Sequence, residues 1–353
     1  MNKRYHLVTA TSMGVRITPT ERQPAGAGRG YTMQATSAES NVLNVPASLG
    51  MRTLVLTRFV QGSPIAAFIK GELGRRGIAF EGPDIPQGGP WGYRHQFNIA
   101  DSGFGARGPR VHNDRAGEVG RTICAEDFDL ERVFQRDGAR IVHFSGLFAA
   151  MSPETGQLCL KLSEIARASG TRVSFDLNYR DSFWRGRETE LRDIFSRIAS
   201  RADILIGNEE DFQLALGIEG PEAGGRDLEG KIESFKAMIA RAQEKYPDAR
   251  VFATTLREVE SANLHHWGAI LRSGGEWHIE KPRPIPVLDR IGGGDSFVSG
   301  LLYGVLKDWV PEQCLRFGWA TGAMAVTMLD DYASPADEEQ VWDIWRGNAR
   351  VKR

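Results

Sequence analysis

The chain has 353 residues, of which 41% are hydrophobic and 25% charged, a composition typical of a globular protein. Its 44 basic and 45 acidic residues give a net charge of −1, so no global basic field could hold nucleic acid or an anionic membrane. No apolar run reaches the ~18 residues that a membrane span needs, and no signal peptide is evident. We therefore expect a cytoplasmic protein without nucleic-acid or membrane partners, which binds any phosphate locally.

The N-terminal third contains few segments that could bury a core. Short apolar strands are predicted at Val8–Ala10 and Leu54–Thr57, and a helix at Ser63–Arg76. Pro46 interrupts a second helical pattern over Glu39–Leu49. Because an interior proline costs about 3 kcal/mol in a helix, we expect a kink or a late helix start there.

Two segments of this region, approximately 13–36 and 85–122, are rich in glycine, proline and polar residues. We interpret them as a lid over an active site, with plain surface loops as the alternative. Gly103–Gly108 within the second segment matches GxGxxG, but no strand precedes it and Pro109 follows it. A dinucleotide site needs a strand before this motif and a helix after it, so we do not interpret it as one.

From Arg140 onward, short β-type runs alternate with longer helical ones. Strands are predicted at Ile141–Phe144, Val173–Leu177, Ile204–Ile206, Val251–Thr254, Gly268–Leu271 and Trp277–Ile279. Helices are predicted at Pro153–Ala168, Glu190–Ile198, Asp211–Leu216, Lys231–Glu244, Ser296–Leu306, Gln313–Met328 and Glu338–Trp345. This alternation indicates an α/β fold with a doubly wound, mostly parallel sheet, which binds ligands at the carboxyl ends of its strands.

The adjacent residues His265 and His266 raise the possibility of a metal site. Neighbouring side chains of a strand point to opposite faces, so one ion would rarely reach both. We expect this pair in a loop or at a sheet edge.

The segment Asp289–Gly300 carries the strongest chemical signal, because three consecutive glycines lead directly into a helix. Glycines let successive amides point toward one spot, and the helix start adds partial positive charge there. Asp295 follows the glycines and would cap the helix in the simplest interpretation. Beside a phosphate pocket, however, a carboxylate is costly unless it works as a base.

The same residues also resemble a serine hydrolase motif with Ser296 as the nucleophile. That pattern needs a histidine later in the chain, and the last one is His278. We therefore prefer phosphoryl transfer to acyl hydrolysis.

The sequence DRIGGGDSFVSGLLYG resembles the signature of the ribokinase (PfkB) family of carbohydrate kinases, and most closely the 2-keto-3-deoxygluconate kinases within it. The similarity covers most of residues 140–353 and is much weaker before residue 125. Supporting segments are His143–Gly146, Ser174–Arg180, Asn208–Asp211, Thr254–Arg257 and Trp267–Ala269.

The resemblance implies one ribokinase-like kinase domain over residues 1–353, with a small β lid, and ATP and Mg²⁺ as cofactors. It implies Asp295 as general base and an anion hole formed by Gly292, Gly293 and Gly294. Further nucleotide-site residues would be Thr255, Arg257, Asn208 and Gly322. Asp211 would organise Mg²⁺ through water, at a position where the family has glutamate. Asn208 could equally be a helix cap, and both roles can hold together.

On the sugar side, the resemblance implies contacts from Ser37, Asn41, Arg94, Arg115 and Arg180. Arg180 follows a strand, and a guanidinium can grip a carboxylate with two parallel hydrogen bonds; a surface arginine is the alternative. The family motif Gly-Gly-Ala-Glu-x-Asn reads Thr36–Asn41 here, and an earlier Gly-Glu pair reads Thr11-Ser12. These departures cluster on the sugar side, so they leave phosphoryl transfer intact and bear on the substrate.

We therefore expect ATP-dependent phosphorylation of a sugar acid, namely 2-keto-3-deoxygluconate at its terminal hydroxyl. A neutral-sugar kinase of the fructose type and a non-catalytic sugar-acid binding protein are the alternatives. Relatives pair through their lid strands, so a homodimer is a further expectation.

Overall fold

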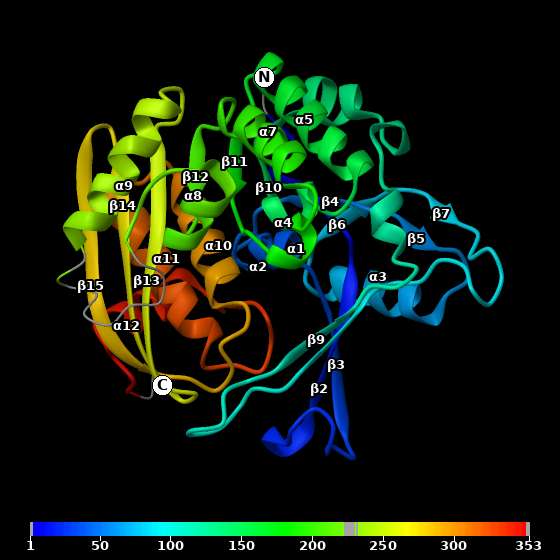
Figure 1. The fold of residues 1–353 in the computed structure, drawn as a ribbon, viewed down its shortest axis with the longest axis horizontal. Helices are drawn as coiled ribbons and strands as arrows, with labels where there is room; N and C mark the ends of the chain where they lie inside the picture. The colour runs from blue at the N-terminus through cyan, green and yellow to red at the C-terminus, as the bar shows by residue number, and fades with distance from the viewer. Residues whose placement is uncertain (1–2, 222–229, 231, 351–353) are drawn as a thin grey trace.

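Parallel strands form the centre of the molecule (Figure 1). The computed structural model describes residues 3–221, 230 and 232–350, and within them nine strands form one sheet in the order β15-β14-β13-β12-β11-β10-β1-β4-β6. The strands from β13 to β6 pair in parallel, whereas β14 and β15 return antiparallel. Their bounds are β1 (Tyr5–Ala10), β4 (Thr53–Leu56), β6 (Ala79–Glu81), β10 (Ala139–Ser145), β11 (Arg172–Asp176), β12 (Ile204–Ile206), β13 (Val251–Ser261), β14 (Leu264–Ser273) and β15 (Glu276–Pro286).

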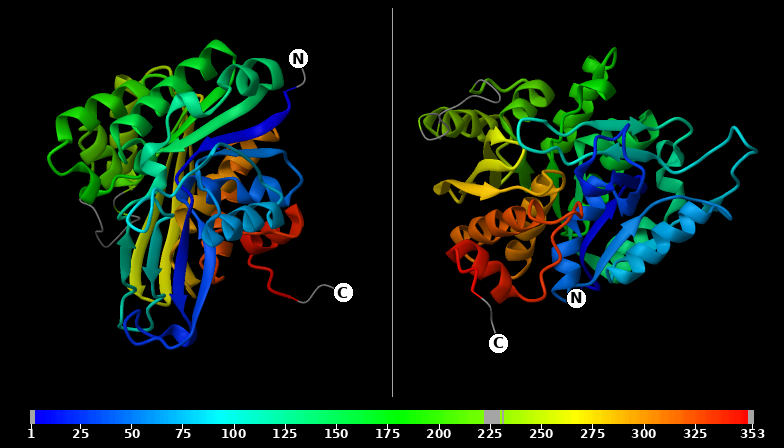
Figure 2. Two further views of the ribbon diagram at one scale, coloured as in Figure 1. Left: turned by 90° about the vertical axis from the view of Figure 1, so that its right-hand side faces the viewer. Right: turned by 90° about the horizontal axis from the view of Figure 1, so that it is seen from below.

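Helices cover both faces of this sheet, which confirms the doubly wound α/β architecture (Figure 2). One face carries α4 (Gly146–Ala149), α5 (Pro153–Ala168), α6 (Asp181–Trp184), α7 (Glu188–Ala199), α8 (Glu209–Leu216) and α9 (Ile232–Lys245). The other carries α1 (Ala38–Val42), α2 (Asn44–Ser48), α3 (Pro64–Arg75), α10 (Gly293–Leu306), α11 (Pro311–Ala325) and α12 (Glu338–Arg346). Each face of the central sheet therefore has its own apolar core.

Local sequence signals explain several helix ends. Ser152 caps α5 with its hydroxyl, and Pro153 occupies the first helical position, where a missing amide hydrogen costs nothing. The expected break before Pro46 is present: α1 ends and α2 begins around Leu43, so the proline lies in the first turn of a new helix. The helix predicted from Lys231 is α9, although Lys231 itself lies outside the described residues.

A second sheet of four strands projects from the N-terminal half (Figure 1). Its order is β3-β2-β8-β9, and its strands are β2 (Gly14–Pro19), β3 (Tyr31–Thr36), β8 (Phe97–Ala100) and β9 (Val111–Asp114). A further small pair joins β5 (Phe59–Val60) to β7 (Asp84–Ile85). The two segments that we interpreted as a lid supply all four strands of the second sheet, and their action as a lid stays a prediction.

The GxGxxG segment forms the tip of the β8–β9 hairpin and leads into no helix. Its Gly105 accepts a hydrogen bond of 2.9 Å from the Ala262 amide and donates one of 2.6 Å to Asn263 Oδ1. The hairpin tip of the second sheet is therefore fastened to the β13–β14 turn of the main sheet.

The expected loop or edge position for the two histidines is wrong, because both lie inside β14, between β13 and β15. Strands β13 to β15 are much longer than predicted. Their outer ends contain many polar residues and therefore lack the pattern of apolar residues from which a strand is predicted. His265 is buried and His266 faces Glu260 across the strand pair, so the two side chains do point to opposite faces.

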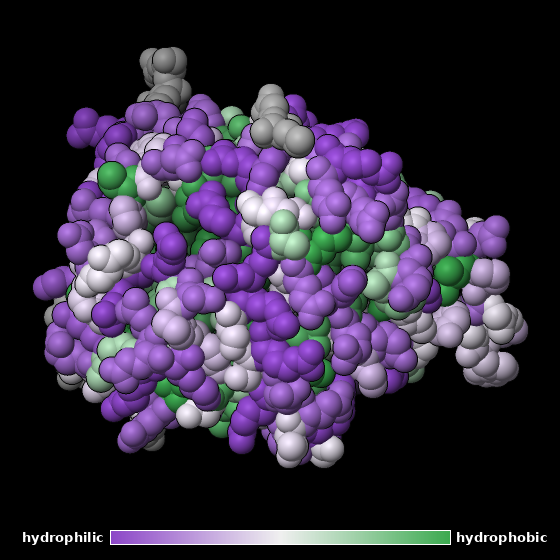
Figure 3. Space-filling view, turned by 90° about the horizontal axis from the view of Figure 1, so that it is seen from above, coloured by the Kyte–Doolittle hydropathy of each residue, from purple (hydrophilic) through white to green (hydrophobic). Residues whose placement is uncertain are grey.

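None of the helices described is long and apolar enough to cross a membrane. Seen from the end where the chain begins, the surface is mostly hydrophilic, with hydrophobic atoms in scattered patches (Figure 3).

Candidate active site

The glycine segment forms a turn before α10 and leaves backbone amides open. Gly292 has a φ of 82°, and a Cβ there would lie 1.9 Å from the Asp331 carbonyl oxygen. A Cβ on Gly294 would meet nothing within 4 Å. Among the described residues, no acceptor takes the amide hydrogens of Gly293, Gly294 or Asp295. Open amides at the positive end of a helix are suited to bind an anion.

Asp295 lies in the first turn of α10 and is half-buried. Its Oδ2 accepts a hydrogen bond of 2.8 Å from Asn41 Nδ2 on α1. Burial raises the pKa of Asp295 to about 7; the Asn41 hydrogen bond opposes this shift, and the nearby carboxylates of Asp331 and Glu39 reinforce it. A carboxyl group with a pKa near neutrality is suited to accept a proton at physiological pH.

A second pair of acids lies beside this carboxyl group: Asp176 ends β11, and Asp211 lies in the first turn of α8. Burial raises the pKa of Asp176 well above its usual range, and the neighbouring Asp211 and Asp295 add to the shift. Burial also raises the pKa of Asp211 to about 6. Three acids therefore converge at the carboxyl edge of the sheet, where an incoming cation would be stabilised.

Asn208 and Asp211 hold each other at the start of α8. Asn208 Oδ1 accepts from the Asp211 amide at 2.9 Å, and Asp211 Oδ2 accepts from the Asn208 amide at 2.8 Å. The helix-cap interpretation of Asn208 is thus confirmed, and its contact with nucleotide stays a prediction. Among the described residues no cluster of three metal-ligating side chains occurs. Mg²⁺ commonly uses one or two carboxylates with waters and phosphates, so Asp176 and Asp211 fit an ion held through water.

A small hollow opens beside the glycine turn. It is lined by Arg257, His265, Trp267, Ile285, Val287, Arg290, Gly293 and Val326. The Trp267 indole nitrogen is buried without a hydrogen-bond partner among the described residues. Apolar walls with a few polar groups are typical of a small-molecule site.

Two arginines that form no ion pair with the described part of the chain, Arg257 and Arg290, line this hollow. Burial lowers the pKa of Arg257 to about 10, and the positive charge of Arg290 lowers it further. Burial also lowers the pKa of Arg290, and Arg180 adds to that shift. Like charges held this close repel one another, so an anion between them is favoured.

The other expected nucleotide residues lie nearby but do not line the hollow. Thr255 is on β13, two residues before Arg257 and thus on the same face of the strand. Gly322 lies behind the hollow, where a Cβ would meet Trp267 at 2.9 Å and the Gly293 carbonyl oxygen at 3.0 Å. Gly322 therefore permits close packing of α11 against the glycine turn.

Two of the residues expected on the sugar side reach Asp295. Asn41 donates to it directly, and the charge of Arg180 lowers its pKa. Arg180 is exposed, and within the described residues its side chain makes one hydrogen bond, from Nη1 to the Tyr179 carbonyl oxygen at 2.7 Å. Ser37 instead caps α1, since its Oγ accepts from the Ser40 amide at 3.0 Å.

The remaining two arginines of the sugar side are engaged by carboxylates. Arg94 forms an ion pair with Asp114 in the second sheet. Arg115 Nη1 lies 2.7 Å from Glu118 Oε1, which also accepts a 2.5 Å hydrogen bond from Ser12. Neither guanidinium is therefore as free to receive a ligand carboxylate as Arg180.

Comparison with known proteins identifies the family. The sequence profile of the pfkB family carbohydrate kinases matches residues 126–337, more than half of the chain. The protein is a pfkB family carbohydrate kinase. The match includes the glycine turn and Asp295, and it ends after Asp331, which packs against Gly292.

Two relatives match this kinase over nearly its full length, and a third over about half of it. The 2-dehydro-3-deoxygalactonokinase of Haloferax volcanii is 24% identical over 98% of this chain and 99% of its own. The crystal structure of 2-dehydro-3-deoxygluconokinase from Thermotoga maritima is 26% identical, covers 97% of this chain and 100% of its own, and has a TM-score of 0.86. The 5-dehydro-2-deoxygluconokinase of Clostridium tetani is 30% identical, but over only 53% of this chain and 50% of its own.

Sequence reasoning missed several residues at or near the candidate site. Glu39 is fully buried and accepts hydrogen bonds from the Thr11 and Ser145 hydroxyls, and burial raises its pKa. Arg290 lies inside the quoted glycine motif, so its place could have been inferred. The place of His265 beside the hollow could not have been inferred, because it depends on the length of β14.

The pKa of Asp295 predicts the pH dependence of this kinase. We expect kcat to rise as pH increases through about 7, because only the ionised carboxylate can accept a proton. The same shift destabilises the fold with rising pH, since the folded pKa lies above the unfolded value of 3.8. Measuring kcat from pH 5 to 9 at saturating substrates tests this expectation. A constant kcat across that range would contradict it.

Proposed function

We propose that this kinase transfers the γ-phosphoryl group of MgATP to the terminal hydroxyl of a sugar acid, with 2-keto-3-deoxygluconate as the preferred substrate and its 6-phosphate as product. The observation that carries the proposal is the position of Asp295. A carboxyl group with a pKa of about 7 lies in the same helix turn as three open amides. The proposed base and the proposed anion hole would therefore lie side by side.

In this proposal each residue of the candidate site has a separate role in the reaction. ATP supplies the phosphoryl group, and Arg257 and Arg290 would hold its phosphates. The amides after Gly292 would stabilise the charge on the transferred group, a contribution of about 3 kcal/mol for one such donor elsewhere. Asp295 would take the hydroxyl proton while Asn41 fixes its carboxylate. Asp176 and Asp211 would hold Mg²⁺ through water.

Arg180 favours an acidic substrate. It is exposed, close to Asp295, and has no carboxylate partner among the described ion pairs. A sugar whose terminal hydroxyl reaches Asp295 could place its carboxylate on this guanidinium. The names of the three relatives, all kinases of dehydro-deoxy sugar acids, support the same class.

One observation favours a neutral sugar as the second candidate substrate. Arg94 and Arg115 are both neutralised by carboxylates, which leaves a single free arginine on the sugar side. An ADP-release assay with sugar acids and neutral sugars separates the candidates. We expect kcat/KM for a sugar acid to exceed that for fructose by at least ~10². Binding of an acid without any turnover would instead indicate a non-catalytic binding protein.

Replacing Arg180 with alanine tests the carboxylate contact. We expect KM for the sugar acid to rise by at least ~10-fold, because a charge-assisted pair is worth about 1.5–3 kcal/mol. KM for a neutral sugar should change little. Arg185→Ala is the matched control, since Arg185 is exposed at the opposite end of α6 and its side chain pairs only with Asp181 among the described residues. Equal effects of Arg180→Ala on acid and neutral sugars would exclude the carboxylate role.

We further infer a cytoplasmic homodimer that pairs through the second sheet. Its outer strands β3 and β9 expose Tyr31, Met33 and Val111, each between 44% and 52% exposed. Unpaired outer strands with apolar side chains are suited to association. A monomeric mass in sedimentation at micromolar concentration would contradict the dimer.

A further inference from the structure

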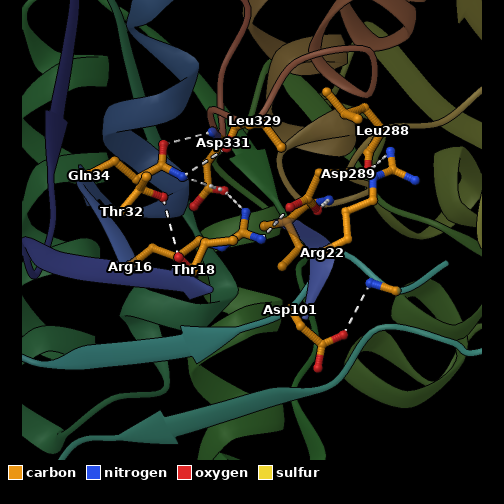
Figure 4. A network of polar contacts seen from close by, with 12 residues as sticks. Arg16, Thr18, Arg22, Thr32, Gln34, Asp101, Leu288, Asp289, Leu329 and Asp331 are labelled. Atoms are coloured by element: carbon orange, nitrogen blue, oxygen red, sulfur yellow. Dashed lines mark hydrogen bonds and ion pairs between the residues drawn. The ribbon is translucent and has the colours of Figure 1, made fainter. Parts of the chain in front are cut away.

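Arg16 connects the second sheet to the region behind the glycine turn (Figure 4). It lies in the middle of β2, and its side chain is only 1% exposed. Its Nη2 contacts Asp289, and its Nη1 contacts Asp331. Both carboxylates are buried as well, so one guanidinium neutralises two acids that belong to separate loops of the main domain.

The two aspartates brace the glycine turn from both sides. Asp289 Oδ1 accepts a hydrogen bond of 3.1 Å from the Ile291 amide, which fixes the entry to the turn. The Asp331 main chain lies against Gly292, in the space that a side chain at Gly292 would fill. The position of the guanidinium is therefore coupled to the direction of the open amides.

A hydrogen-bond chain also runs from Arg16 to the proposed base. Asp331 Oδ2 accepts from Thr36 Oγ1 at 2.9 Å, and Thr36 Oγ1 accepts from Asn41 Nδ2 at 3.2 Å. The same Asn41 nitrogen donates to Asp295 Oδ2 at 2.8 Å. The chain thus connects Asp331 to Asp295 through Thr36 of β3 and Asn41 of α1.

We propose that Arg16 is a positioning residue for phosphoryl transfer, which sets both the glycine turn and Asp295 through its bridge between Asp289 and Asp331. The inference rests on the proposed function of that turn. Only the fork of an arginine can hold two carboxylates in fixed directions; a lysine offers one compact charge. Because Arg16 lies on β2, movement of the second sheet would also be transmitted to the anion hole.

The charge of Arg16 should also act on Asp295. That carboxyl group faces Asp331, Glu39 and Asp176, with Arg180 as the opposing charge and Asn41 as a hydrogen-bond donor. Asp331 raises the pKa of Asp295, and in the intact protein Arg16 compensates the Asp331 charge. Removing Arg16 should therefore raise the pKa of Asp295 further.

The test compares Arg16→Lys and Arg16→Met with Arg58→Met, which removes another partly buried arginine, paired with Asp127, away from the site. For Arg16→Lys we expect kcat to fall by at least ~10-fold, with both KM values within ~3-fold. For Arg16→Met we expect a shift of the acid limb, which is the rise of kcat with increasing pH. Its midpoint should move to higher pH by about half a unit or more. Arg58→Met should lose stability without moving the acid limb. The same pH profile in Arg16→Met and wild type would overturn the proposal.

A double variant separates the effect of the uncompensated Asp331 charge from the loss of the positioning role of Arg16. In Arg16→Met/Asp331→Asn the uncompensated charge is gone, so the acid limb should return toward the wild-type value while kcat stays low. Full recovery of kcat would overturn the positioning role. Hydrogen exchange over residues 289–296 needs no sugar: Arg16→Lys should accelerate it by at least ~10-fold, and Arg58→Met should not. Unchanged exchange overturns the proposal even if wild-type protein phosphorylates no sugar, an outcome that would refute the proposed function separately.

Discussion

Replacing Asp295 with asparagine is expected to lower kcat by at least ~10² while ATP affinity stays near its wild-type value. Asparagine keeps the size of the side chain and its contact with Asn41, but it cannot accept the hydroxyl proton. The loss should therefore appear in the chemical step, measured as single-turnover formation of the sugar phosphate. The fold should be retained or stabilised above pH 7, since a buried charge is removed.

The matched control for this change is Asp193→Asn, an acid on the exposed side of α7. It should leave kcat unchanged. If Asp295→Asn turned over sugar at the wild-type rate, Asp295 would not be the base.

The second large effect is expected for Gly292→Ala. A Cβ would need a φ of 82°, which alanine rarely adopts, and would collide with the Asp331 carbonyl oxygen at 1.9 Å. The turn must shift and carry its amides with it, so kcat should fall by at least ~10² because anion-hole donors are worth about that much. Thermal unfolding and kcat measured together separate the two consequences.

Gly347→Ala provides the comparison for backbone strain alone. Gly347 has a φ of 72° at the end of α12, with nothing within 4 Å of a Cβ. This variant should lose some stability and keep its kcat. A Gly292→Ala protein with wild-type kcat would show that the turn does not form the anion hole.

The parallel sheet and the proposed centre of the site were predictable because their signals are local. Short, mostly apolar runs identify β10, β11 and β12 in the sequence. These strands are buried on both faces, so they contain few polar residues. The glycine turn and Asp295 are contiguous in sequence, so the geometry of the helix start follows from residue order alone.

The residues that were missed depend on contacts between distant segments. Arg16 is a charged residue in a Gly- and Pro-rich stretch, and its two aspartate partners lie more than 270 positions away. Arg94 and Arg115 looked available for a sugar acid, but in the fold Arg94 pairs with Asp114 of β9 and Arg115 pairs with Glu118. The outer ends of β13 to β15 pair through backbone groups, which residue polarity does not reveal.

A crystal structure with ADP, Mg²⁺, aluminium fluoride and 2-keto-3-deoxygluconate tests the central claim most directly. We expect the fluoride group to accept hydrogen bonds from the amides of Gly293 and Gly294, and the sugar hydroxyl to lie about 2.6–3.2 Å from the Asp295 carboxylate. A fluoride group bound away from that turn, or a hydroxyl held by another side chain, would contradict the account.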